Sequence, residues 1–189
     1  MSQAPSDVAG LRPPPPGKYE LDRAHTTVEF VARHMLTRVR GRFTDFDGII
    51  EVGERPEDSQ IDVEIRVASI QTNEPRRDAH MRSGDFFELE TYPVITFHSI
   101  AVRPTGGAGF EIDGELTIKD ETRPITLKGE FLGSGPGMSE GSTILGATAR
   151  ARVFREDWGM NWNMVMETGG FLVSKDVDIE IEVEALKVG

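Results

Sequence analysis

The sequence predicts an all-β protein, an extended and closed barrel of eight antiparallel strands. From Lys18 onward about eight segments have strand character, and the clearest alternate apolar with polar residues, as strands with one buried and one wet face do in antiparallel sheets. No helical pattern of more than two or three turns is present. Several segments run ten to twelve residues, longer than the usual strand. Long strands with one apolar face favour a barrel, because closure leaves no exposed sheet edge.

Residues 1–16 are expected to be a disordered, proline-rich tail ahead of one folded domain at 17–189. The tail includes the run Pro13 to Pro16 among Ala, Ser and Gly residues, a composition that favours disordered or extended chain. It has no apolar run after a basic region, so it does not resemble a secretory signal, and we expect a cytoplasmic protein. No stretch approaches about 18 consecutive apolar residues, so we expect no membrane span.

Two of the expected strands alternate without error. Ile61 to Val67 places apolar residues on one face and charged residues on the other, and Val177 to Ala185 repeats the pattern. An eight-stranded interior is either filled with side chains or holds one small ligand. The expected strands cover residues 25–34, 41–52, 61–67, 92–103, 109–119, 124–132, 143–154 and 177–185, with turn signals at 119–123 and 133–142 between them.

Composition argues against several classes of function. The 21 basic and 32 acidic residues sum to a net charge of -11, which disfavours a nucleic-acid groove or an anionic-membrane patch as the main feature of the surface. Cysteine is absent, which excludes disulfides, thiolate catalysis and Cys-ligated zinc. The four histidines are scattered, and neither a nucleophile elbow nor a nucleotide-binding glycine loop is present. We therefore predict no catalytic residue, no metal and no cofactor.

Five blocks in this order give the chain a family resemblance from Lys18 to Leu186. They are YELDRAHTTVEFVARHM (19–35), VRGRFTDFDG (39–48), ASIQTNEPRRDAHMRSGDFFELETYPVITFHS (68–99), GELTIKDETRPITL (114–127) and REDWGM (155–160). The chain resembles the YceI-like family of lipocalin-like β-barrels. The resemblance implies an extended barrel whose apolar channel takes an isoprenoid or another long-chain amphiphile, often a dimer, and it implies no enzyme activity. Many members carry a secretion signal, where this chain has the proline-rich tail.

The segment RRDAHMRSGDFFELE (76–90) lacks the alternation of apolar and polar residues that is typical of strands. Its i, i+4 spacings favour a helix of about two turns that ends at Gly84. As a lid across the barrel mouth, the segment would close the apolar interior with Met81 and one of Phe86 and Phe87. The cationic side chains would then face an anionic head group; these are Arg76, Arg77, His80 and Arg82. The alternative is a solvated connection with local salt bridges to Asp78, Asp85, Glu88 and Glu90.

A second basic cluster lies at 33–42, with Arg33, Arg38, Arg40 and Arg42. Arginine binds phosphate and carboxylate groups bidentately, so the cluster is a candidate anion site. Exposed turn arginines are the commoner explanation. His34 continues the apolar face of its strand and therefore points inward, either as a core residue or toward a head group.

Residues 155–171 hold both tryptophans and three of the seven methionines. Methionine is flexible and could line a site for a flexible chain, or it could plug the barrel as ordinary core. The candidate ligand-binding residues of the channel and mouth are Phe30, His34, Arg38, Phe43, Phe46, Arg77, His80, Met81, Arg82, Phe86, Phe87, Phe97, Trp158, Met164 and Phe171.

The sequence thus favours non-catalytic binding, transport or storage of an isoprenoid, of polyprenyl phosphate or quinone type, or of a similar long-chain amphiphile. The expected partner is that lipid, with a possible homodimer and no nucleic acid. One alternative is an enzyme that acts on a lipid or small amphiphile at the mouth, with His34 or His80 as acid-base group. Another is a barrel filled with side chains that serves as an interaction module.

Overall fold

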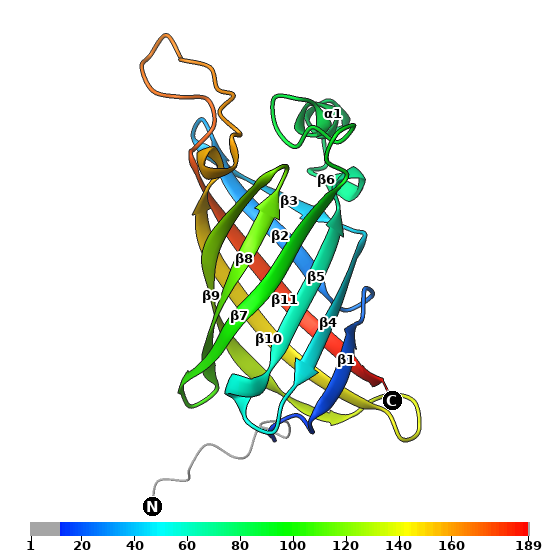
Figure 1. The fold of residues 1–189 in the computed structure, drawn as a ribbon. Helices are drawn as coiled ribbons and strands as arrows, with labels where there is room; N and C mark the ends of the chain where they lie inside the picture. The colour runs from blue at the N-terminus through cyan, green and yellow to red at the C-terminus, as the bar shows by residue number, and fades with distance from the viewer. Residues whose placement is uncertain (1–11, 189) are drawn as a thin grey trace, which may run out of the picture.

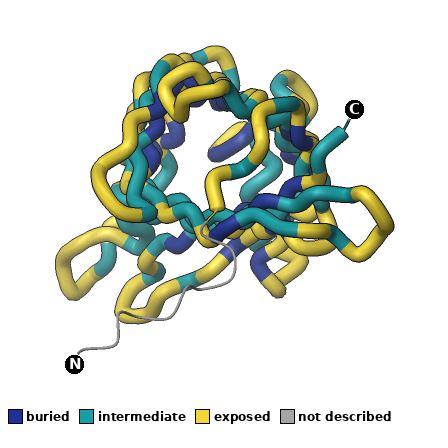
Figure 2. Tube along the Cα trace, turned by 90° about the horizontal axis from the view of Figure 1, so that it is seen from below, coloured by how far each residue is buried: buried dark blue, intermediate teal, exposed yellow. Residues whose placement is uncertain are grey.

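The computed structural model describes residues 12–188, which form one closed antiparallel barrel (Figure 1). Eight strands make the ring in the order β1-β4-β5-β7-β8-β9-β10-β11, and pairing of β1 with β11 closes it. Seen along its axis from below, the wall forms a complete ring (Figure 2). The predicted all-β, eight-stranded barrel is therefore confirmed. The ring strands are β1 (Gly17–Leu21), β4 (Phe46–Val52), β5 (Gln60–Arg66), β7 (Val94–Gly106), β8 (Gly109–Ile118), β9 (Glu121–Pro136), β10 (Thr143–Phe154) and β11 (Asp176–Val188).

Three further strands continue the wall toward one end, which we call the mouth. β11 pairs with β1 through residues 185–188 and with β2 through residues 178–182. β2 pairs with β3, and β3 pairs with β6. Of these strands, β2 and β3 lie between β1 and β4 in the chain, whereas β6 follows β5. The additional elements are β2 (Thr27–His34), β3 (Thr37–Phe43), β6 (Ile70–Gln71), the helix α1 (Pro75–Arg82) and the short 3-10 turns η1 (Pro56–Asp58), η2 (Val67–Ser69) and η3 (Arg155–Trp158).

Three expected strand boundaries are corrected. β1 was not expected, because its five residues are too few to show an alternating pattern. The expected strand 41–52 is two strands, since the Thr44 N–H donates to the Ser69 hydroxyl at 3.1 Å and leaves the ladder there. β9 extends into the expected loop 133–142, because residues 133–136 pair with β10.

The opposite end, the base, is closed by a small apolar cluster. Tyr19 and Ala185 are fully buried there with Leu145. The Tyr19 hydroxyl donates to the Pro15 carbonyl at 2.8 Å, and burial raises the pKa of Tyr19. Of the expected tail 1–16, residues 1–11 lie outside the described residues, and Arg12 accepts a hydrogen bond from the Ser134 hydroxyl at 2.9 Å.

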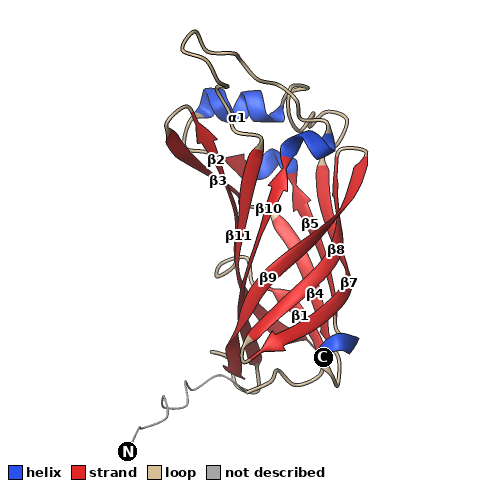
Figure 3. Cartoon of the chain, turned by 90° about the vertical axis from the view of Figure 1, so that its left-hand side faces the viewer, coloured by secondary structure: helices blue, strands red, loops and turns tan. Residues whose placement is uncertain are grey.

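The helix α1 lies across the mouth end of the barrel (Figure 3). Its start is fixed by Pro75 in the first turn and by Glu74, whose carboxylate accepts the Arg76 N–H at 3.0 Å. The predicted short helical lid segment is therefore present. None of the helices at 12–188 has the length and apolar character needed to cross a bilayer.

Candidate ligand cavity

A cavity of about 530 Å³ lies inside the barrel, lined by residues from Leu21 on β1 to His80 on α1. The inward positions of the alternating strands form its wall, so the faces expected for Ile61 to Val67 and Val177 to Ala185 are the ones turned inward. Its apolar strand lining is Leu21, Val28, Phe30, Ala32, Val39, Phe43, Ile61, Val63, Ile65, Ile95, Phe97, Leu116, Ile118, Ile125, Leu127, Val153, Val177, Ile179 and Ile181. The cavity is thus an apolar channel, and this barrel is not filled with side chains.

Two glycines let large rings lie flat against the wall and keep the channel open. A Cβ added at Gly41 would lie 2.2 Å from Cζ of Phe30, and one at Gly114 would lie 2.4 Å from Cζ of Phe97. Each ring therefore occupies the space above a glycine on a neighbouring strand. A side chain at either glycine would push the ring toward the channel axis.

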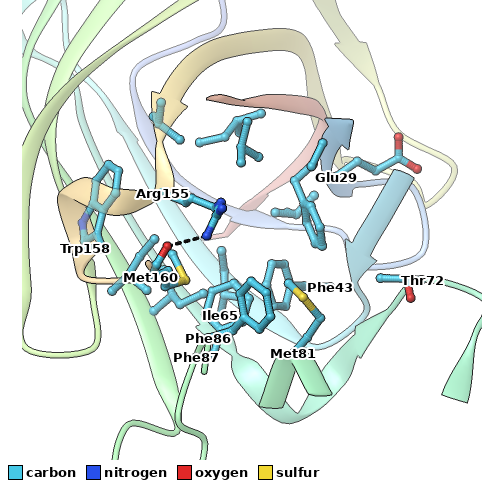
Figure 4. Close-up of a pocket in the computed structure, with 18 of the residues that line it drawn as sticks. Glu29, Phe43, Ile65, Thr72, Met81, Phe86, Phe87, Arg155, Trp158 and Met160 are labelled. Carbon is cyan, nitrogen blue, oxygen red and sulfur yellow. Dashed lines mark hydrogen bonds between the residues drawn. The ribbon is translucent and has the colours of Figure 1, made fainter. Parts of the chain in front are cut away.

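The lid segment turns both of its adjacent phenylalanines inward (Figure 4). Phe86 and Phe87 are buried, and the Phe87 ring packs edge-on against Phe43 with centroids 5.8 Å apart. The expectation that only one of the pair would face the interior is wrong, because the pair lies in a turn rather than a strand and is not bound to alternate. Met81 lines the channel beside them, as expected.

His80 joins the lid to the loop at 159–175. Its ring meets Trp162 edge-on at 4.5 Å between centroids and Phe86 at 5.1 Å. Its Nε2 lies 2.7 Å from Oδ2 of Asp85. These contacts link α1 to the loop at 159–175 beside the cavity.

Two lid arginines that were expected at a head group donate most of their hydrogen bonds to backbone carbonyls. Arg77 donates from Nε to the Thr72 hydroxyl at 2.8 Å and from Nη2 to the Thr72 carbonyl at 2.7 Å. Arg82 donates from Nη2 to the Ile70 carbonyl at 3.0 Å, so it does not reach the channel. These two side chains therefore fasten the lid to β6.

At the mouth, two other arginines have guanidinium groups without a hydrogen bond or ion pair within residues 12–188. Arg33, at the end of β2, and Arg76, in α1, both line the cavity. The other polar residues in the mostly apolar lining are Glu29, His34, Thr72, Arg77, His80 and Arg155.

Arg155 is a site residue that the sequence reasoning did not single out. Its guanidinium is 4% exposed and lines the channel. It donates to the carbonyl of Met160 at 2.6 Å (Figure 4). It also donates to the carbonyls of Trp162 at 2.8 Å and Ser174 at 2.8 Å. Burial lowers the pKa of this guanidinium. Its place in the block REDWGM, beside Trp158, was the available signal.

The candidate residues divide into two groups by position. Ten of them line the channel, namely Phe30, His34, Phe43, Arg77, His80, Met81, Phe86, Phe87, Phe97 and Trp158. Five lie outside it, namely Arg38, Phe46, Arg82, Met164 and Phe171. Arg38 pairs with Asp178 on the outer wall and Phe46 is buried in the surrounding core. Met164 and Phe171 are exposed because their loop folds back on itself through a Val165–Phe171 bridge.

Comparisons with known proteins match this architecture. Residues 19–185 fit the family profile described as YceI-like domain. A UPF0312 protein of Staphylococcus aureus (strain N315) is 34% identical over 169 residues, 88% of this chain and 95% of that protein. The structure of BcnA from Burkholderia cenocepacia superposes with a TM-score of 0.73 at 21% identity, covering 87% of this chain and 98% of that one. A polyisoprenoid binding domain from Saccharophagus degradans superposes with a TM-score of 0.64 at 14% identity, covering 92% and 99%.

Proposed function

We propose that this chain, which belongs to the YceI-like domain family, binds and carries a long-chain amphiphile of isoprenoid type without altering it chemically. The observation that carries this proposal is the mostly apolar cavity of about 530 Å³ inside the barrel. That volume lies within the range of about 300 to 1,000 Å³ typical of small-molecule sites. The cavity lining extends from Leu21 on β1 to Arg76 and His80 on α1 at the mouth, which suits a chain that enters by its tail.

The tail should provide most of the affinity. Each methylene moved from water into an apolar channel contributes about 0.8 kcal/mol, so a five-carbon isoprene unit contributes up to about 4 kcal/mol. Two or three such units offset an association cost of about 4 to 15 kcal/mol. The channel offers such a tail apolar side chains from seven of the ring strands and from β2 and β3.

The head group would sit at the mouth, where the polar lining residues gather. Arg33, His34 and Arg76 can donate hydrogen bonds to a phosphate or to a quinone oxygen. The polyisoprenoid-binding domain from Saccharophagus degradans has the same barrel, which supports an isoprenoid of polyprenyl phosphate or quinone type as the ligand class.

Native mass spectrometry of the purified protein, followed by organic extraction, tests the proposal. We expect a stoichiometric long-chain adduct, or uptake of a polyprenyl phosphate or quinone presented in detergent. Ile125→Trp places an indole against the channel and should reduce the amount of adduct, because the larger side chain takes part of the volume that a tail would fill. The matched variant Ile100→Trp adds the same group to a side chain that is 64% exposed on the outer wall, and it should keep the adduct.

A clean apo mass that persists after incubation with polyprenyl phosphates, quinones and fatty amides would contradict the proposal. An unchanged adduct in Ile125→Trp would place the ligand outside the channel. Circular dichroism of both tryptophan variants separates a narrowed channel from a failure to fold.

A further inference from the structure

Exposed apolar side chains gather on two segments at the mouth end. Ten large apolar side chains are exposed within residues 12–188, and five of them lie on the β2–β3 turn and on the loop at 160–174. We call these five the apolar rim: Met35, Leu36, Met164, Val165 and Phe171. Leu36 is 92% exposed and Val165 is 77% exposed. Clusters of this kind on a protein surface mark interaction sites, whereas single exposed apolar residues do not.

The two segments form one continuous surface. The Met35 N–H donates to the Leu172 carbonyl at 2.8 Å, and the Ser174 N–H donates to the Arg33 carbonyl at 2.9 Å. His34 and Val173 form an antiparallel bridge, and both also line the cavity. In Figure 1 the loop at 160–174, drawn in orange, projects beyond the end of the barrel close to the β2–β3 turn. The rim therefore surrounds part of the channel opening and extends outward from it.

The two segments that carry the apolar rim have a positive formal charge, although the whole chain is strongly acidic. Residues 33–42 hold four arginines and no acid, and residues 160–174 hold one acid, Glu167, and no base. The two segments thus sum to 4 minus 1, or +3, in a chain of net charge -11. Arg38 and Arg40 also pair with acids of the wall, whereas the Arg33 guanidinium makes no ion pair or hydrogen bond within 12–188. A second copy of the same rim would bring like charges together, which disfavours self-association.

We propose that the apolar rim docks onto an anionic lipid surface, so that the mouth faces the bilayer and the long-chain ligand passes between membrane and channel. Apolar side chains flanked by arginine are the combination that binds at a lipid interface. Passage of the ligand between membrane and channel rests on the proposed function, whereas the docking surface rests on the rim alone. The negative total charge predicts no anionic-membrane patch, and the rim is a local exception to that expectation.

Vesicle flotation tests the docking surface. The probes are phosphatidylcholine vesicles with and without phosphatidylglycerol. We expect binding to the vesicles that contain phosphatidylglycerol, and we expect added salt to weaken it, because salt screens exposed charges. The double variant L36E/V165E should lower the affinity at least about tenfold, since moving even one such side chain into an apolar interface is worth that much.

The control is I100E/L132E, which makes the same change of charge on exposed side chains of the barrel wall. It should bind vesicles like the unchanged protein. Full binding by L36E/V165E, no vesicle binding by the unchanged protein, or equal binding to neutral vesicles would each overturn the proposal. So would a dimer that L36E/V165E dissociates while neither protein binds vesicles.

Ligand uptake from detergent micelles, followed by native mass spectrometry, separates the two proposals. L36E/V165E should still take up the long-chain ligand, because neither side chain lines the cavity. A protein that docks but takes up no ligand would contradict the carrier function and leave the docking surface standing. A protein that takes up ligand but does not dock would contradict the docking surface and leave the carrier function standing.

Discussion

At the scale of single residues, Arg155 holds the loop at 159–175 by hydrogen bonds from inside the barrel. Replacing it with glutamine would leave the buried carbonyl of Met160 and the part-buried carbonyls of Trp162 and Ser174 without their charged donor. We expect Arg155→Gln to lower the free energy of unfolding by about 3 kcal/mol, since unpaired buried polar groups cost about 1 to 3 kcal/mol each and relax in part. Urea denaturation measures this loss.

Arg152, three residues earlier on β10, provides the comparison. It is 63% exposed and pairs with Asp178 at 2.7 Å. Exposed ion pairs contribute about 0 to 1 kcal/mol, so Arg152→Gln should cost no more than that. Equal losses in the two variants would show that the hydrogen bonds of Arg155 do not stabilise the loop.

His25 should make stability depend on pH. Its Nδ1 lies 2.8 Å from Asp22 and 3.7 Å from Glu184, and the hydrogen bond to Asp22 raises the pKa of His25. Because the folded-state pKa lies above the unfolded value of about 6.5, the protonated ring stabilises the fold below that value. This stabilisation is lost as pH rises through the folded-state pKa. His25→Asn should therefore destabilise the protein at about pH 5.5 and have less effect at about pH 8.5.

Urea denaturation of both proteins at the two pH values, with the pKa of His25 followed by NMR, checks this expectation. An equal loss at both values would assign the role of His25 to its neutral hydrogen bond.

At the scale of elements, the lid is held to the barrel through Thr72. The Thr72 hydroxyl donates to Asp78 at 2.5 Å and accepts from Arg77 Nε at 2.8 Å. Thr72→Val keeps the shape and removes both bonds, at a cost of about 1 to 3 kcal/mol confined to the lid. We expect faster hydrogen exchange in α1 and faster ligand release, with the strands unaffected.

The exposed Thr91, whose hydroxyl donates to Glu88 at 3.1 Å, is the matched control, and Thr91→Val should change neither rate. Exchange in α1 that stays at its original rate in Thr72→Val would mean that the remaining contacts, among them the Arg82 bond to Ile70 and the ring contacts of His80, hold the lid closed.

At the scale of the whole molecule, closure of the ring at the base should couple all the strands. Tyr19 is fully buried on β1, the strand that pairs with both β4 and β11. Tyr19→Ala should cost about 3 to 5 kcal/mol through the cavity it leaves. Tyr19→Phe removes only the bond to Pro15 and should cost about 1 kcal/mol.

The two tryptophans make this prediction measurable. Trp158 and Trp162 both lie at the mouth, far along the chain from Tyr19. If the barrel unfolds as one unit, tryptophan fluorescence should report the same shift in midpoint as circular dichroism. Separate transitions would mean that mouth and base unfold independently. The expected homodimer and the cytoplasmic location stay predictions, to be checked by analytical ultracentrifugation and by cell fractionation.

The sequence by itself determined the architecture and the apolar character of the interior. Strand alternation is a local property with a period of two, so Ile61 to Val67 and Val177 to Ala185 reveal their inward faces without any knowledge of their partners. The lid helix was also readable, because its i, i+4 spacing and its end near Gly84 lie within one segment.

Only the tertiary structure decided which arginines near the mouth have guanidinium groups without a hydrogen bond or ion pair within residues 12–188. Arg77 and Arg82 look like Arg33 and Arg76 in the sequence, yet the first two bond to carbonyls of residues 72 and 70. The burial of Arg155 depends likewise on carbonyls brought together by the loop at 159–175. A hydrogen-bond partner is a matter of three-dimensional proximity, and a periodic pattern in the sequence carries no information about it.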